Sequence, residues 1–320
     1  MDVLILGGTG FLSGEAARAF IRRGHAVTCA ARGVTGTAPN GASFIPWDRA
    51  TAPPFDLLEQ SPDIVLDISS HPAHVGTALG LFPYARWIYM SSISVYPAMA
   101  EPLGGPADTE TAEPVTEGGP EDYPGLKVAC EQLVDQRSPN HAIVRPGLIV
   151  GPGDPTGRFT YWPARIAEAA GDGLPYIAPA LPQDPMQWID VRDLADWIVR
   201  LAESTDIGVW EAIGEPMPRE TFLAEISTIV EGNPTPIWLD ADVLIEQEIG
   251  FWSGERALPM YAPIPELAHM MNRDPQPARD QGLVTRPLTQ TARDTLRAGG
   301  QSSGLSRPDE LAVLRTLGYI

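Results

Sequence analysis

The sequence predicts an α/β fold, with a doubly wound parallel sheet in the first half and a smaller, irregular lobe in the second. Three observations support this prediction. Short apolar runs alternate with helical segments up to about residue 150. The runs are continuously apolar, which suits strands covered on both faces, as in parallel sheets. Beyond residue 150, helical and proline-broken segments replace the regular alternation that a doubly wound α/β layer requires.

The individual elements follow from the same patterns. A helix is predicted for residues 11–24, ending at Gly24. The strands predicted in the first half are residues 2–6, 26–31, 43–47, 63–69, 86–92 and 141–147. In the second half we predict helices at 159–173 and 219–232, a strand end running into a helix at 189–203, and a strand at 208–214. We expect a final amphipathic segment, 307–320, to dock on the surface.

Composition narrows the classes of function. The chain has 320 residues, of which 43% are hydrophobic and 20% charged, as in soluble globular proteins. Its net charge of −19 argues against nucleic-acid binding, which needs a basic surface. No apolar stretch approaches the roughly 20 residues of a membrane span, and the first residues lack the basic start of a signal peptide.

Cysteine and histidine usage points the same way. The two cysteines, Cys29 and Cys130, cannot make a disulfide framework, and no Cys/His cluster has metal-ligand spacing. We therefore expect a cytoplasmic protein that binds a small-molecule substrate, with no metal, no nucleic acid and no membrane as partner.

The stretch GGTGFLSG, residues 7–14, ends the first predicted strand and opens the first helix. A dinucleotide-binding fingerprint needs this context. Gly7 permits the sharp turn, Gly10 lets the backbone approach a pyrophosphate, and the helix N-terminus offers unpaired N–H groups to the negative charge. Ser13 stands at the usual third glycine, a packing position that accepts a small residue. Taken alone, the motif also fits a plain glycine turn.

This motif gives the two halves their expected roles. We predict a Rossmann dinucleotide-binding domain at residues 1–155 and a mainly substrate-binding lobe at 156–320. A part of the second half, about 186–214, is expected to return to the first sheet.

The end of the second strand indicates which dinucleotide binds. An acidic residue there holds the adenosine ribose hydroxyls of NAD, whereas a basic residue suits the 2′-phosphate of NADP. The strand ends in Ala31 and Arg32, with no acid. The sequence thus favours NADP(H) over NAD(H), although Arg32 also fits an ordinary surface cation.

Three side chains suggest the chemistry. Tyr123 and Lys127 are four residues apart in a predicted helix, so both lie on one face. A nearby ammonium stabilises a phenolate, which would lower the tyrosine pKa and make Tyr123 a general acid–base. Serines in YMSSISVYP follow the fifth strand, at the edge of the sheet where ligands of α/β proteins bind. Each feature is weak by itself; the three together, in this order, are much stronger.

At this point the chain resembles the extended short-chain dehydrogenase/reductases of the NAD-dependent epimerase/dehydratase type. The matching segments are GGTGFLSG, YMSSISVY, YPGLKVACE, VRPGLIVGPGD, WIDVRDLADWI and GLVTRPLTQTARDTL. The resemblance implies Ser92 as catalytic hydroxyl, Tyr123 as acid–base, and Lys127 as the residue that lowers its pKa and binds ribose. The cofactor-binding residues that it implies are Gly7, Thr9, Gly10, Phe11, Leu12, Arg32, Asp48, Ile68, Ser69, Lys127, Pro146 and Leu148.

Departures from the family pattern narrow the reaction. Dehydratases of this family carry Thr-Asp-Glu where this chain has Ser92, Ile93 and Ser94, so elimination of water is disfavoured. A long acidic Pro/Gly loop at 97–122 precedes Tyr123, and we expect it to be a flap on the substrate side.

We therefore predict an NAD(P)-dependent oxidoreductase that transfers hydride between nicotinamide and a carbonyl or alcohol substrate. The alternative is a sugar-nucleotide epimerase that retains NAD. A non-catalytic cofactor-sensing regulator is disfavoured by the Tyr/Lys pair. The resemblance also names a homodimer as the assembly to consider.

Overall fold

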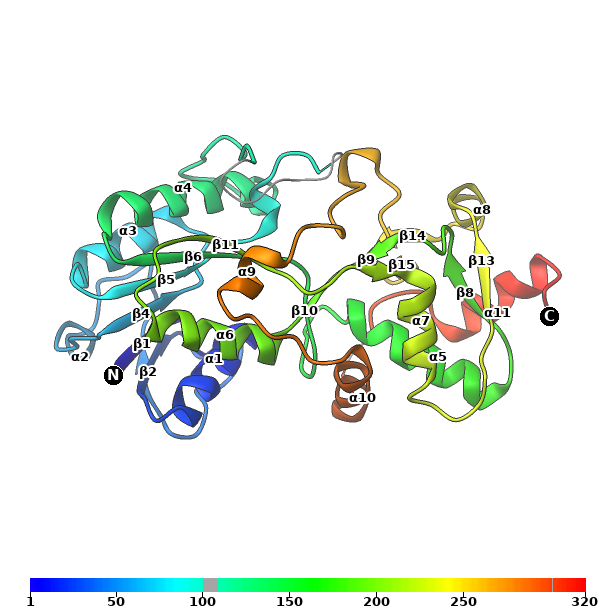
Figure 1. The fold of residues 1–320 in the computed structure, drawn as a ribbon, viewed down its shortest axis with the longest axis horizontal. Helices are drawn as coiled ribbons and strands as arrows, with labels where there is room; N and C mark the ends of the chain where they lie inside the picture. Colours follow the sequence, from blue (N-terminus) through cyan, green and yellow to red (C-terminus); the bar gives the residue numbers. More distant parts are fainter. Residues whose placement is uncertain (100–108, 301) are drawn as a thin grey trace.

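A seven-stranded parallel sheet forms the centre of the first lobe in the computed structural model, which describes residues 1–99, 109–300 and 302–320 (Figure 1). The strand order is β11-β6-β5-β4-β1-β2-β3. The strands are β1 (Asp2–Leu6), β2 (Ala26–Ala31), β3 (Ala42–Pro46), β4 (Ile64–Asp67), β5 (Arg86–Met90), β6 (His141–Pro146) and β11 (Gly208–Ala212). The predicted doubly wound α/β class is confirmed.

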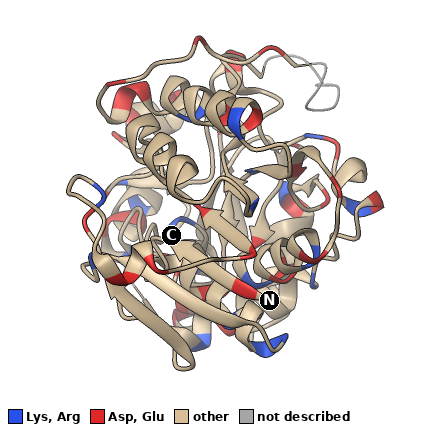
Figure 2. Cartoon of the chain, turned by 90° about the vertical axis from the view of Figure 1, so that its left-hand side faces the viewer, with Lys and Arg blue, Asp and Glu red and all other residues tan. Residues whose placement is uncertain are grey.

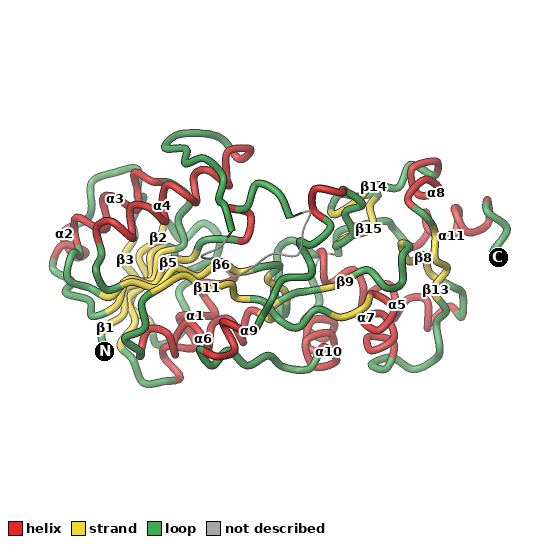
Figure 3. The backbone as a smooth tube through the Cα atoms, turned by 45° about the horizontal axis from the view of Figure 1, so that its top comes forward, coloured by secondary structure: helices red, strands yellow, loops and turns green. Residues whose placement is uncertain are grey.

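Helices cover both faces of the sheet, which is why its strands are apolar without alternation. Every residue of β4, β5 and β6 is buried. Figure 3 shows helices on both sides of the sheet. One face carries α1 (Phe11–Arg22), α6 (Val191–Glu203) and α9 (Gln276–Asp280); the other carries α2 (Phe55–Leu58), α3 (Pro72–Leu81) and α4 (Tyr123–Arg137).

The topology fixes where a ligand would bind. All strands of the seven-stranded sheet are parallel, but the chain adds strands on opposite sides of β1, with β2 on one side and β4 on the other. In such sheets the crevice beyond the carboxyl ends of the central strands is open to ligands. Leu6 is aligned with Ala30 of β2 and with Asp67 of β4, so the residues after these three positions meet at one place.

The chain returns to this sheet from the second lobe. Helix α6 packs against α1, and β11 pairs with β6 in parallel, Trp210 opposite Val144. Asp190 begins α6 as an N-cap, since its side chain accepts a hydrogen bond from the Arg192 N–H at 2.9 Å. This cap sets the start of α6 at Val191, where the apolar periodicity of the segment begins.

The second lobe has its own core, in which aromatic side chains of α5 and α7 pack with side chains of short strands. Its helices are α5 (Arg158–Asp172), α7 (Arg219–Ser227), α8 (Ala241–Glu246), α10 (Leu288–Ala298) and α11 (Arg307–Thr316). Its strand pairs are β8 (Tyr176–Pro179) with β13 (Pro236–Leu239) and β14 (Gly250–Trp252) with β15 (Ala257–Pro259). Two further pairs lie nearer the first lobe, β7 (Ile149–Val150) with β10 (Ile189–Asp190) and β9 (Pro185–Met186) with β12 (Met217–Pro218).

Several predicted boundaries differ from the observed ones. The strand predicted at 63–69 ends at Asp67, and the helix predicted at 219–232 ends at Ser227. The amphipathic segment expected at 307–320 contains helix α11, which ends at Thr316, before Gly318 with φ +78°. These ends are set by turns that apolar periodicity does not record. The predicted flap at 97–122 lies partly outside the described residues, which omit 100–108.

Three further features are the distribution of charge, the lengths of the helices and the state of the cysteines. Figure 2 shows basic residues scattered among acidic ones on the face that it presents. Among the described helices, none combines the length and the apolar character needed to cross a membrane. Cys29 and Cys130 are both free thiols and both buried.

A buried network of charges links the sheet to the segment before α9. Glu211 of β11 pairs with Arg273, and both side chains are nearly inaccessible to solvent. The Tyr96 hydroxyl donates to Glu211 at 2.5 Å and accepts from Arg145 at 2.9 Å. Arg145 in turn pairs with Glu131 of α4 at 2.6 Å. Removing one member of such a network leaves an unpaired charge in a dry environment.

We therefore expect Arg273→Met to lower the free energy of unfolding by about 3–5 kcal/mol, because Glu211 would lose its cation while still buried. Urea denaturation followed by tryptophan fluorescence measures this. The control is Arg279→Met, because the side chains of Arg279 and its partner Glu215 are both about half exposed. Its expected loss of unfolding free energy is below about 1 kcal/mol. Equal losses in the two variants would contradict the prediction.

Candidate active site

The glycine-rich turn between β1 and α1 is held tightly against the neighbouring strand. Gly7 has φ +91°, and its N–H donates to the Ala30 carbonyl at 2.8 Å. A Cβ atom on Gly8 would lie 2.4 Å from Cys29 Sγ. Glycine is thus needed at the first position for its backbone angle and at the second for space.

Ser13 stabilises this turn through its hydroxyl group. Its Oγ donates to the Gly7 carbonyl at 2.6 Å and accepts from the Gly10 N–H at 3.1 Å. The side chain is fully buried. The sequence predicted only that a small residue is tolerated here; the structure shows that the serine joins the two glycines. Helix α1 has no acidic residue in its first turn, so its N-terminus remains suited to an anion.

A cavity of about 520 Å³ lies beyond the carboxyl ends of β1, β2 and β3. The sequence-predicted residues that line it are Gly7, Thr9, Gly10, Arg32, Asp48, Ile68 and Ser69. Arg32 is exposed and forms no ion pair with any described residue. Asp48 is turned toward its own loop, since its Oδ1 accepts the Ala50 N–H at 3.0 Å.

Arg49 is a residue of this cavity that the sequence did not single out. It makes a two-pronged pair with the buried Asp67, at 2.7 and 2.8 Å, and donates to the His74 carbonyl at 2.6 Å. Asp67 also accepts the Ser69 N–H at 2.9 Å. This arrangement fixes the backbone after β4. The sequence signal for this ion pair is Asp67, an acid at the end of an otherwise apolar strand. Its partner Arg49 is 18 residues away, so the sequence pattern does not reveal the pair.

Two histidines also line the cavity. The His71 and His74 rings are 4.9 Å apart. Burial, together with the charge of Arg49, lowers the pKa of His74. No group of three or more metal-binding side chains occurs among the described residues, and these two make no such cluster.

A second cavity, of about 300 Å³, adjoins the first and shares Ile68 with it. The sequence-predicted residues that line it are Phe11, Leu12, Ile68, Ser92, Tyr123, Lys127, Pro146 and Leu148. The two cavities thus bring all the predicted catalytic and cofactor-binding positions to one continuous lining. Asp154 and Arg158 of the same lining were not predicted.

Lys127 is buried beneath this lining. Its Nζ donates to three backbone carbonyls, those of Ile68 at 3.2 Å, Ser69 at 3.1 Å and Met90 at 2.6 Å. Desolvation by burial lowers the pKa of the ammonium from the ordinary 10.5 to about 8. The side chain comes from the second turn of α4 and reaches the ends of β4 and β5.

The pKa of Tyr123 differs from the sequence-based expectation. Burial raises it above its ordinary value, and the Ser92 side chain acts against that rise. Lys127 does not lower it, because Nζ faces the three carbonyls and lies 5.9 Å from the Tyr123 ring centroid. In this structure the phenol is therefore protonated at neutral pH.

Ser92 begins the short helix η1 (Ile93–Val95). Its Oγ accepts the Ser94 N–H at 3.1 Å and donates to the Ser94 hydroxyl at 3.0 Å. Ser91, the neighbouring residue, has a buried hydroxyl without a hydrogen-bond partner among the described residues. Both serines line the second cavity.

Arg158 and Asp154 form the wall on the side of the second lobe. Both oxygens of Asp154 accept hydrogen bonds from Thr156, while burial raises the pKa of the carboxyl. The Arg158 guanidinium lies 5.0 Å from the Trp252 ring centroid. It has no carboxylate within ion-pair distance among the described residues.

Comparisons with known proteins agree with this geometry. Residues 72–211 match the model of the NAD dependent epimerase/dehydratase family. No curated protein matches the chain. Among solved structures, a UDP-glucose 4-epimerase is 14% identical with TM-score 0.65, covering 94% of this chain and 100% of that one. A UDP-glucuronic acid 4-epimerase from Bacillus cereus, in complex with NAD, is 15% identical with TM-score 0.65, covering 93% and 98%. A UDP-N-acetylglucosamine 4-epimerase from the same organism is 13% identical with TM-score 0.63, covering 93% and 96%.

The sheet order, the glycine-rich turn and these structural likenesses define a Rossmann-type α/β fold that the chain shares with the epimerase structures. The family model matches residues 72–211, the part of the chain that runs from α3 into β11. The family and the structural neighbours indicate an NAD-dependent enzyme of the extended type.

The lowered pKa of Lys127 has a consequence for stability. Between pH 8 and 10.5 the unfolded chain binds this proton and the folded chain does not, so the free energy of unfolding rises with pH. We expect the native protein to gain up to roughly 3 kcal/mol over this range relative to Lys127→Met. Urea denaturation at pH 7, 8, 9 and 10 measures the difference, in which the titration of all other groups cancels. A constant difference would contradict the prediction.

Proposed function

We propose that the protein is an NADP(H)-dependent oxidoreductase acting on a carbonyl or alcohol substrate. One observation carries this proposal: Ser92, Tyr123 and Lys127 line a single cavity that continues past the glycine-rich turn. The N-terminus of α1 lies between the two cavities and fits the pyrophosphate of a dinucleotide. The two halves of the dinucleotide would then extend into the cavities on either side.

When bound, the nicotinamide supplies or accepts the hydride. The protein supplies the proton and the geometry. In the reductive direction Tyr123 donates its phenolic proton to the substrate oxygen, and Ser92 donates a hydrogen bond to the same oxygen. The raised pKa of Tyr123 supports this direction, because the phenol holds its proton at neutral pH and is ready as an acid.

Lys127 is assigned two tasks. It holds the Ile68 and Ser69 backbone, where the two cavities meet. The family resemblance further implies that its ammonium binds the ribose hydroxyls and stabilises the phenolate left on Tyr123. The ammonium already has three carbonyl partners, so it changes partners when it takes up ribose. A pKa of about 8 allows it to exist in both charge states near neutral pH.

The preference for NADP(H) is supported by the adenosine end of the cleft. Arg32 lines this cavity, is exposed, and is not paired with a described carboxylate. The guanidinium of Arg49, in contrast, is occupied by Asp67. Arg32 is therefore the cation available for a 2′-phosphate.

A second candidate function is a sugar-nucleotide epimerase that retains its cofactor, which the neighbours named as epimerases favour. An epimerase would be purified with bound dinucleotide and would show no net turnover of it. We also propose a cytoplasmic location, which the two free thiols support. The homodimer remains a prediction.

Tyr123→Phe tests the proposed role of Tyr123 as proton donor. Loss of the hydroxyl removes the proton donor, so NADPH oxidation with a panel of aldehydes and ketones should fall by roughly 10²–10⁴-fold. Binding of NADPH, followed by its fluorescence, should change by less than about threefold, since the ring remains. Unchanged turnover would rule out Tyr123 as the acid–base.

Arg32→Ala tests the proposed preference for NADP(H). Arg32→Ala should weaken NADPH binding by about 10–100-fold through loss of a charge-assisted hydrogen bond, while NADH binding stays within twofold. Arg297→Ala, an exposed arginine of α10 outside both cavities, is the matched control. Equal affinity of the native protein for NADH and NADPH would contradict the assignment.

A further inference from the structure

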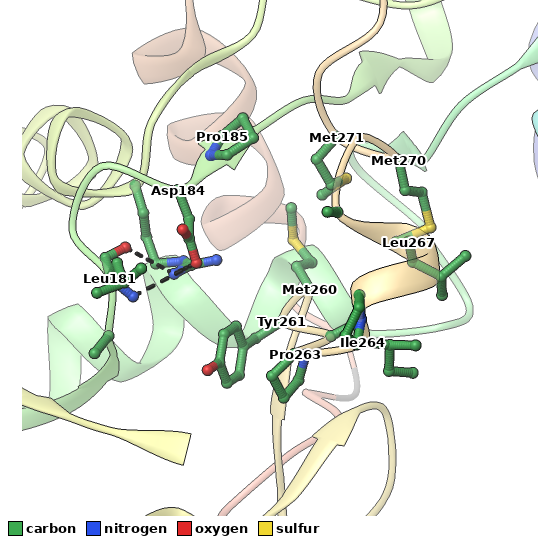
Figure 4. Close-up of a pocket in the computed structure, with 15 residues that line it drawn as sticks. Leu181, Asp184, Pro185, Met260, Tyr261, Pro263, Ile264, Leu267, Met270 and Met271 are labelled. Carbon is green, nitrogen blue, oxygen red and sulfur yellow. Dashed lines mark hydrogen bonds and ion pairs between the residues drawn. The ribbon is translucent and has the colours of Figure 1, made fainter. Parts of the chain in front are cut away.

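A third cavity, of about 340 Å³, lies in the second lobe (Figure 4). Its walls are the segment 180–185, Arg219 at the start of α7, and the segment 260–271. It has no lining residue in common with the two cavities of the candidate active site. Nothing in the proposed reaction assigns it a role.

The lining is mainly apolar. Figure 4 shows Met260, Met270 and Met271 with Leu267 and Tyr261 around the cavity. Methionine side chains are flexible and polarisable, so they adapt to rings and alkyl groups of different shapes.

Two apolar side chains of the lining are also exposed to solvent. Leu181 is 62% exposed and Ile264 is 45% exposed. They come from different wall segments, 180–185 and 260–271. Covering them would remove apolar surface from water, which favours binding of an apolar molecule.

The charges of the cavity cancel within the protein. Among its lining residues the only carboxylate is Asp184 and the only cation is Arg219, and the two pair at 3.1 Å. Arg219 Nη1 also donates to the Leu181 carbonyl at 3.0 Å. Its guanidinium lies 4.9 Å from the Tyr261 ring centroid. The cavity therefore offers no unpaired positive charge.

One part of the guanidinium remains without a partner. Arg219 is 4% exposed, and its buried Nε donates to no described residue. All of its hydrogen bonds within the described chain come from Nη1 and the backbone. Because this Nε is closed to solvent, a charged group of a ligand in the cavity would find no partner on Arg219.

These features select against a nucleotide diphosphate. Such a molecule brings at least two negative charges, and burying each without a counter-charge costs several kcal/mol. An uncharged molecule meets no such penalty and gains from the apolar walls.

The cavity also contacts the chain that follows Ser92. Met270 lines it and packs against the cluster that contains Ile93 and Val95, directly after Ser92. The Met99 N–H donates to the Glu266 carbonyl and the His269 N–H to the Met99 carbonyl, each at 2.7 Å. A ligand in the cavity thus rests on a wall that is bonded to the segment after Ser92.

We propose that this cavity is a binding site for an uncharged, mainly apolar organic molecule with a ring or branched alkyl body. The assignment concerns binding alone, so it does not depend on the reaction of Tyr123 or on the choice of dinucleotide.

The test titrates the full-length protein with N-phenyl-1-naphthylamine, an uncharged aromatic probe whose fluorescence rises in apolar surroundings. Saturable binding at one site is expected. Ile264→Glu and Leu181→Glu place a carboxylate on exposed parts of the lining, so they leave the core intact. Each should raise the Kd about tenfold or more, since the new charge must lose water when the probe binds.

The matched control is Ile245→Glu, on α8 and outside the cavity, with a side chain 58% exposed. Its Kd should equal that of the native protein. UDP-glucose at millimolar concentration should not displace the probe. The absence of saturable binding, equal Kd values for all three glutamate variants and the native protein, or displacement by UDP-glucose would each overturn the proposal.

Discussion

The Lys127 ammonium imposes the constraint on which the candidate active site depends. Backbone carbonyls at the end of a parallel strand find no N–H donor on a neighbouring strand. Three such carbonyls, those of Ile68, Ser69 and Met90, converge below the cleft. One ammonium has three donors and satisfies all three. Because Lys127 belongs to α4, this contact fixes the start of the helix against β4 and β5. It thereby positions Tyr123, one turn earlier, and the Ile68 side chain that both cavities share.

Ion pairs stabilise this same edge of the sheet at several strand ends. Asp67 is the last residue of β4, and Arg145 lies near the end of β6. Glu211 lies one residue before the end of β11. Each charge is buried and has a partner from a different element, which orients loops that apolar packing alone would leave loosely defined. The second lobe uses the same device at Glu310, whose carboxylate accepts the Ile177 N–H at 2.8 Å and pairs with two arginines.

The sequence predicted what depends on local pattern. The seven strands, the glycine turn and the placement of Ser92, Tyr123 and Lys127 follow from periodicity and short motifs. Contacts between distant residues could not be predicted. Arg49 meets Asp67 across two strand ends, and Arg158 reaches the cavity only because the second lobe folds over it. The pKa of Tyr123 was predicted in the wrong direction, since spacing on a helix does not reveal which way an ammonium points.

The position of β11 at the edge of the sheet has a consequence for the order in which the protein is made. Residues 208–212 cover the outer edge of β6, yet they are synthesised after the first part of the second lobe. Until then β6 is an open edge strand, of the kind that pairs with other chains. Glu211 forms its ion pair only after Arg273, some sixty residues later, has been synthesised. A ribosome therefore releases the first lobe in its finished form only when most of the second lobe has already emerged.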